Sequence, residues 1–177
     1  MLRGIRIAGL AAVLTVLVLP SVGSAGSRSG VAPVGRLSSG LVAQINALRL
    51  AHGLVPVRVS PSLRAAANVH STQMARLGYF SHDSANGGSF SSRIATFYPA
   101  RGYRSWTVGE NLLWASPDVG ALRALKMWLA SPPHRANLLN PRWREIGLVA
   151  VHARSAPGVY GNAPTTIVTA DFGTRSK

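Results

Sequence analysis

Helical and strand patterns lie in different parts of this 177-residue chain, and their order leaves few architectures open. Apolar residues recur at helical spacing in four segments between residues 38 and 131. Strand patterns come late, at 145–152 (EIGLVAVH) and 165–172 (TTIVTADF), with a Gly-, Pro- and Asn-containing loop between them. Residues 106–113 predict another strand. Helices followed by antiparallel strands predict an α+β domain built from packed layers.

Start and stop signals place the helices. The serines at 38–39 are predicted to cap the first helix. The second is sharply marked, with Ser60 as cap, Pro61 at the first helical position and Gly78 just past the end. A shorter helix is predicted over Phe90–Phe97. The Ser-Pro pair at 116–117 predicts the start of a fourth helix.

The amino end has the three parts of a secretory signal peptide. Arg3 and Arg6 precede an apolar run at 7–19, and small residues then lead to Ala25. This run is shorter than the roughly 20 residues that span a bilayer, so cleavage is favoured over an uncleaved anchor. The predicted organisation is a signal peptide at 1–25, a flexible linker at 26–37 and one domain at 38–174. No segment after the signal is apolar enough to span a membrane, and a secreted or envelope-associated monomer is expected.

Charge and cysteine content limit the partners and the means of stabilisation. The chain has no cysteine, so an exported domain must depend on its core rather than on disulfides. Without Arg3 and Arg6, 17 basic residues face 5 acidic ones, a net charge of about +12. Such charge favours anionic partners, namely acidic lipid, an anionic wall polymer or nucleic acid, and weak attraction to an anionic envelope surface is expected. Nucleic acid is disfavoured, because the arginines are scattered and no recognition motif accompanies them.

Three short segments carry candidate site residues. His82 follows a predicted helix end in YFSHD, Glu110 lies within the apolar stretch GENLLW, and His134 begins a short helical turn after Pro132 and Pro133. A buried glutamate must be paired or hydrogen-bonded. Each residue taken alone fits a structural role better than a site. A fourth residue, His70, lies on the apolar face of the second helix, which favours a buried, structural histidine.

The order of these segments resembles the CAP superfamily, which includes cysteine-rich secretory proteins, venom antigens and plant pathogenesis-related proteins. The resemblance rests on YFSHD, GENLLWAS, MWLASPPHRANLLNP, EIGLV and the terminal DFG, and covers nearly the whole domain. It is nearest to the compact bacterial branch. The family implies a three-layer α-β-α sandwich with a central antiparallel sheet and a cleft.

The same resemblance implies a cleft lined by two histidines and two glutamates, in which the histidines can hold a divalent metal. By motif, His82 and His134 match the histidines and Glu110 matches the first glutamate. Ser131 stands where the second glutamate is usual. With one carboxylate missing, weak and exchangeable binding of a metal such as zinc at His82 and His134 is expected, and no cofactor is required.

Two functions from different classes stay open at this stage. The first is a non-enzymatic binding module, with no catalytic residue, whose cleft and basic surface engage an envelope component or a small apolar ligand such as a lipid. The second is a metal-assisted hydrolase of peptide or wall material, with Glu110 as base. Because one of the four residues usual in the cleft, the second glutamate, is missing, the binding module is favoured over the hydrolase. A nucleophilic serine is a poorer fit, because Ser81 merely adjoins His82 in sequence.

Overall fold

The structure is a computed structural model that describes residues 30–177. The predicted signal peptide lies outside these residues. The elements, in chain order, are β1 (Val31–Pro33), α1 (Gly35–Ala51), β2 (Arg58–Val59), α2 (Pro61–Leu77), α3 (Phe90–Phe97), β3 (Ser105–Ala115), α4 (Ala121–Ala130), α5 (Pro132–Leu138), β4 (Glu145–Ala156), a 3₁₀ turn (Gly158–Tyr160) and β5 (Ala163–Ser176).

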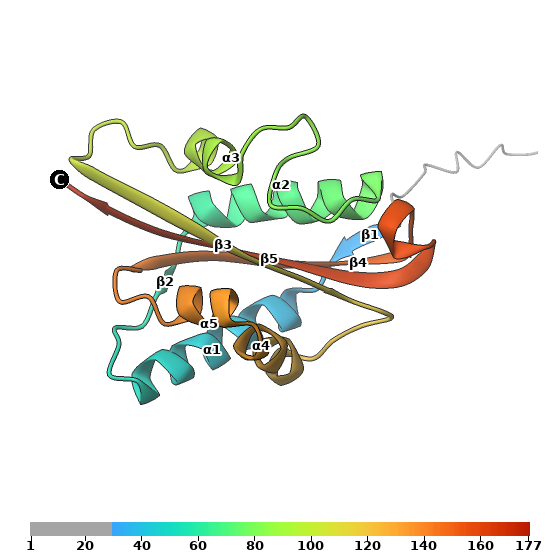
Figure 1. The fold of residues 1–177 in the computed structure, drawn as a ribbon, viewed down its shortest axis with the longest axis horizontal. Helices are drawn as coiled ribbons and strands as arrows, with labels where there is room; N and C mark the ends of the chain where they lie inside the picture. Colours follow the sequence, from blue (N-terminus) through green and yellow to red (C-terminus); the bar gives the residue numbers. More distant parts are fainter. Residues whose placement is uncertain (1–29) are drawn as a thin grey trace, which may run out of the picture.

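The elements form three layers (Figure 1). Helices α2 and α3 cover one face of the sheet, and α1, α4 and α5 cover the other. The strand order is β1-β4-β5-β3, with β2 also pairing with β4. The long strands are antiparallel, and the short β2 runs parallel to β4. The predicted three-layer α-β-α sandwich is confirmed. No helix among residues 30–177 has the length and apolar character needed to cross a bilayer.

Helices α2 and α3 begin and end where local chemistry predicts. The Ser60 hydroxyl accepts from the N–H of Leu63, Pro61 occupies the first turn, and Gly78 adopts the left-handed conformation that ends α2. The Ser89 hydroxyl caps α3 in the same way. The loop between these two helices contains His82, and α3 contains Arg93; both residues belong to the candidate site described below.

Helix α1 begins earlier than predicted, because tertiary contacts replace a local cap. The hydroxyls at 38–39 donate to carbonyls one turn back, and neither serine caps the helix. The Ser38 hydroxyl also accepts from the N–H of Ala150 in β4. Residues 31–37 therefore differ from the predicted linker: 31–33 pair with the edge of β4, and α1 starts at Gly35.

Helix α4 begins later than its proline signal. It starts at Ala121 after Gly120, and the Ser-Pro pair at 116–117 lies in the connection from β3 instead. The Ser116 hydroxyl donates to the carbonyl of Pro164 at the start of β5, which ties this connection to the sheet rather than to the helix. The cap-and-proline pattern was correct for α2 and wrong here.

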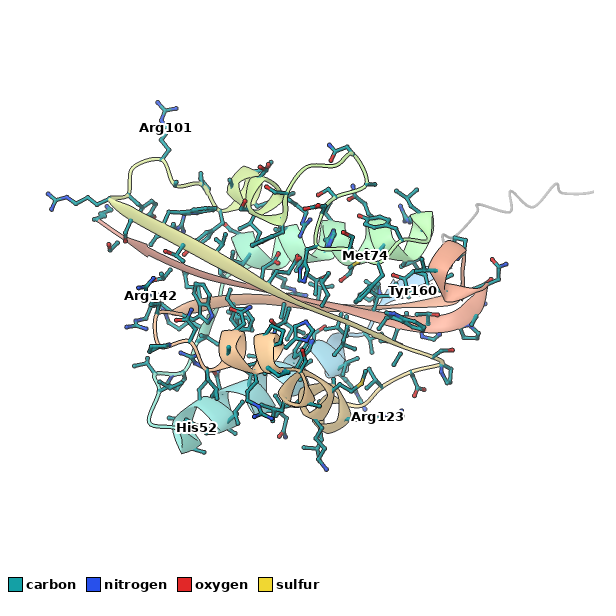
Figure 2. The ribbon with its side chains drawn as sticks, in the orientation of Figure 1. His52, Met74, Arg101, Arg123, Arg142 and Tyr160 are labelled. Atoms are coloured by element: carbon teal, nitrogen blue, oxygen red, sulfur yellow. The ribbon has the colours of Figure 1, made fainter. Side chains whose placement is uncertain are left out.

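Both faces of the sheet are packed. Trp128 and Trp143 anchor the face under α1, α4 and α5, while Met74 and Tyr160 lie in the cluster under α2 (Figure 2). The β4–α2 contact is closest at Gly147. A Cβ built there would lie 2.0 Å from the carbonyl carbon of Leu63. Glycine at this position is what allows α2 to rest directly on β4.

Replacing Gly147 with Ala should disrupt this contact. The new methyl group would meet helix backbone, which cannot rotate away as a side chain could, so we expect a loss of roughly 4 kcal/mol or more in the free energy of unfolding. Gly35→Ala is the control, because nothing lies within 4 Å of a Cβ at Gly35. Urea denaturation measures both variants. Equal midpoints for Gly147→Ala and wild type would contradict the close contact.

Candidate functional site

A buried carboxylate, that of Glu110 in β3, is the centre of the candidate site. Its side chain is completely shielded from solvent. Arg93 of α3 forms an ion pair with Oε2, and Nδ1 of His82 donates a hydrogen bond of 2.8 Å to Oε1. An unpaired charge would be too costly at this depth. Arg93 and His82 together make the buried charge tolerable.

His82 is held in a defined orientation. Besides the contact of its ring with Glu110, its carbonyl accepts from Nη1 of Arg93 over 3.1 Å. Because a carboxylate can only accept, Nδ1 of His82 carries the hydrogen, and Nε2 of the neutral ring keeps its lone pair. The side chain is half exposed. The bond at Nδ1 therefore fixes a half-exposed ring and leaves Nε2 free of Glu110.

The structural role expected for His70 matches its surroundings. The residue is fully buried in α2, and its Nε2 donates to the carbonyl of Ser81 over 2.9 Å. Burial is the main cause that lowers the pKa of His70 to about 4, against the opposing effect of Glu110. The ring is therefore neutral at pH 7. It fixes the loop directly before His82, so its structural role also serves the site.

Asp171 of β5 is a member of the site that the sequence reasoning missed. It lies opposite Glu110 in the β3–β5 ladder and is fully buried. As a carboxylate, it has no hydrogen-bond donor among the described residues. Burial and then the neighbouring Glu110 raise the pKa of Asp171 well above its usual range. The neutral form of Asp171 is therefore favoured beside Glu110, whose own charge is paired with Arg93.

His134 approaches the same strand from the other helical layer. Nδ2 of Asn111, next to Glu110 in β3, donates to the carbonyl of His134 over 3.1 Å. Partial burial, followed by the charge of His82, lowers the pKa of His134. His134 and His82 thus come to β3 from opposite helical layers, His134 through a bond to Asn111 and His82 through a bond to Glu110.

A cleft of about 270 Å³ lies along this edge. Ser131 and His134 line it, so the residue in the place of the missing glutamate does face the candidate site. Most of the remaining lining is apolar: Phe80, Leu112, Leu113, Trp114, Met127 and Trp128. Phe80, Trp114 and Met127 are each more than a third exposed. A ligand there would meet aromatic and aliphatic surface beside His134.

The donor set fits a metal only in part. Within residues 30–177 there is no group of three or more His, Cys, Asp or Glu side chains placed to hold an ion. His82 could contribute Nε2, with Glu110 orienting the ring in the way that carboxylates orient metal-bound histidines. His134 could supply a second nitrogen. Glu110 itself is already engaged with Arg93 and His82.

Arg93 and Asp171 carried signals that sequence reasoning did not use. Arg93 is a single cation in the short helix FSSRIATF, and Asp171 is a single acid in the apolar strand TTIVTADF. An isolated charge within an apolar element is buried only with a partner. That rule could have marked both residues, although it could not have paired them with Glu110.

Replacing Asp171 with Asn should change how stability depends on pH. Above its ordinary pKa of 3.8, the unfolded chain gives up the Asp171 proton that the folded protein keeps. Wild-type stability should therefore fall relative to Asp171→Asn, by up to about 1.4 kcal/mol per pH unit, from roughly pH 4 to the raised folded pKa. Urea unfolding across this range measures the difference. A difference that is independent of pH would mean that the folded protein holds Asp171 charged.

Comparisons with known proteins agree with this fold. The model of CAP, the cysteine-rich secretory protein family, matches residues 42–172. The chain is 33% identical over 110 residues to the uncharacterized protein YkwD of Bacillus subtilis strain 168, a match that covers 62% of this chain and 40% of that protein. It thus spans well under half the length of this relative.

Solved structures show the same architecture. An extracellular protein containing an SCP domain from Bacillus anthracis is 29% identical with a TM-score of 0.56, over 79% of this chain and 41% of that one. An outer surface protein of Borrelia burgdorferi has a TM-score of 0.61, over 77% of this chain and 90% of that one. At 20% identity, the second match bears on the fold alone.

Proposed function

Because this chain belongs to the CAP family of cysteine-rich secretory proteins, we propose that it is a secreted, non-enzymatic binding module. Its ligand is a small apolar molecule or lipid chain, held in the cleft along β3. Export through the predicted signal peptide at 1–25 is part of the proposal. It is supported by the description of the similar SCP-domain protein of Bacillus anthracis as extracellular.

The engagement of Glu110 carries the proposal. A hydrolase of the kind considered above needs a carboxylate that can accept a proton from water at the reacting centre. Both oxygens of Glu110 are already bound, one by Arg93 and one by His82, and the side chain has no solvent exposure. Ser131 offers no carboxylate in compensation. The geometry therefore favours binding over hydrolysis.

The lining of the cleft indicates the class of ligand. Its volume of about 270 Å³ is near the lower limit of ligand pockets, which begin at roughly 300 Å³. Phe80 and Met127 flank it with exposed apolar surface, and Trp114 adds an aromatic ring. Apolar contact supplies the affinity, while the histidine end can hydrogen-bond a polar head group.

Weak metal binding is a second property of the same cleft in our proposal. His82 and His134 would hold the ion through ring nitrogens, and water would complete the coordination. Such a metal would supply a positive charge that attracts an anionic head group. Two protein ligands are fewer than the three usual in catalytic zinc sites, so exchange should be fast and affinity low.

The apolar lining can be tested with a fluorescent apolar probe such as 1-aminoanthracene. The double variant Phe80→Ser, Met127→Gln should weaken its binding roughly 10- to 30-fold, the effect of removing somewhat less than 100 Å² of apolar contact. Val159→Gln is the matched control, because Val159 is an exposed apolar residue outside the cleft. Equal affinities in the three proteins would place the probe elsewhere and reject the ligand proposal.

Metal binding is tested by restoring the missing carboxylate. The Ser131 side chain makes no capping hydrogen bond, so Ser131→Glu removes no known contact while adding an anion to the wall that holds His134. We expect zinc affinity to rise by about 1–3 kcal/mol in a partly exposed cleft. Calorimetric titration compares wild type, Ser131→Glu and His82→Ala. Equal affinity in all three would show that zinc does not bind in this cleft.

A further inference from the structure

Arginines that are scattered in the sequence gather at one end of the sheet. The β-ladders bring together the end of β5, the start of β3, the start of β4 and the short β2. In Figure 1 these termini share the left end of the molecule, and Figure 2 shows Arg101 and Arg142 there. We name this surface the arginine end. Its members are Arg58, Arg101, Arg104, Arg142, Arg144 and Arg175.

The positive charge of the arginine end is largely uncompensated. Glu145 is the one acidic residue there, and it accepts a hydrogen bond from the hydroxyl of Tyr98. Every ion pair among residues 30–177 involves Glu110. Glu110 is buried, and it pairs with Asp171 in the ladder rather than with a residue of the arginine end. The six guanidinium groups repel one another, and the single carboxylate of Glu145 offsets little of that repulsion. The repulsion lowers stability unless an anion binds.

Part of the arginine end is held in place, and part is free to engage a ligand. The guanidinium group of Arg175 stacks on Tyr98 at 3.7 Å and on Tyr103 at 4.5 Å from the ring centres. Arg144 donates to two carbonyls of its own loop. The exposed side chains of Arg101, Arg104 and Arg142 make no hydrogen bond within the described residues. These three can turn toward an anionic partner.

We propose that the arginine end binds a flexible polyphosphodiester polymer that carries no bases. Arginine matches phosphate oxygens with its planar fork of donors. This surface is separate from the cleft, so the proposal does not rest on the proposed function.

Shape and composition favour this partner over a bilayer or a nucleic acid. Arg101 and Arg142 project from different sides of the end (Figure 2), and a flexible chain can reach both more readily than a plane can. The segments 99–104, 140–144 and 173–177 have no large exposed apolar side chain. Val55 and Val59, close to Arg58 in sequence, are exposed, but no exposed aromatic side chain accompanies them, so they offer little surface that would insert into lipid. Tyr98 is buried and Arg175 occupies one face of the Tyr103 ring, which reduces the aromatic surface available for stacking bases.

The test compares two variants of equal charge by fluorescence anisotropy, with the full chain and labelled poly(glycerol phosphate). The first replaces Arg101, Arg104 and Arg142 with Gln. The second is the control and replaces Arg76, Arg123 and Lys126, exposed helical cations outside the arginine end. We expect about a tenfold or greater loss of affinity in the first variant alone. Its slope of log affinity against log salt should fall by about 2 for three lost phosphate contacts.

Equal losses in both variants would overturn the proposal, because net charge alone would then explain binding. Two further probes test the choice of partner. If the protein bound oligothymidylate more tightly than poly(glycerol phosphate), at equal phosphate concentration, the proposal of a polymer without bases would be overturned. Tighter binding to vesicles of anionic phospholipid would overturn the choice of a flexible polymer. Preference for poly(glycerol phosphate) over both supports it.

Discussion

The ion pair between Glu110 and Arg93 is the contact on which the rest of the site depends. It joins β3 to α3 across the interior, and each partner also bonds to His82 in the loop between α2 and α3. Asp171 adds β5 to the same cluster, and His70 adds α2 by fixing the carbonyl of Ser81. One buried negative charge is thus shared among parts of the chain that are far apart in sequence. Removing a partner would leave that charge uncompensated.

This arrangement also explains why the cleft lies at the edge of the sheet. β3 is the last strand in the order, so one of its sides has no neighbouring strand. Trp128 covers part of that side, and its indole N–H donates to the carbonyl of Leu112. His82 arrives from one helical layer and His134 from the other. A central strand could not be reached from both layers in this way, because a neighbour would occupy its edge.

The sequence predicted those parts of the fold that local chemistry determines. Helix α2 was predicted correctly from its cap, proline and terminal glycine, and α3 from its apolar spacing. The long strands were predicted because their patterns are continuous. The starts of α1 and α4 were not, since pairing at the edge of β4 and a bond from Ser116 to β5 determine the chain path there.

The candidate site also has a part that could be predicted from the sequence and a part that depends on tertiary contacts. Motif resemblance picked out His82, Glu110, His134 and Ser131, and the structure places all four around the edge of β3. Arg93 and Asp171 could not be paired with Glu110 from sequence, because strand register and helix docking determine those contacts. The arginine end was missed for the same reason. Its arginines do not form a continuous basic segment in the sequence, and only the pairing of the strands brings them together.

The two buried arginines show how differently one residue type can serve this fold. Arg93 offsets a carboxylate, whereas Arg49 of α1 is fully buried and donates to four carbonyls, those of Val55, Leu138, Asn140 and Trp143. Burial is the main cause that lowers the pKa of Arg49, and nearby Arg144 lowers it further. The carbonyl dipoles make this burial tolerable, because five donors in a fixed fork can meet oxygens on several sides. Since three of those oxygens, those of Leu138, Asn140 and Trp143, belong to the end of α5 and the loop into β4, Arg49 connects α1 to the helix that carries His134. The position of one cleft wall thus depends on a cation that never reaches the cleft.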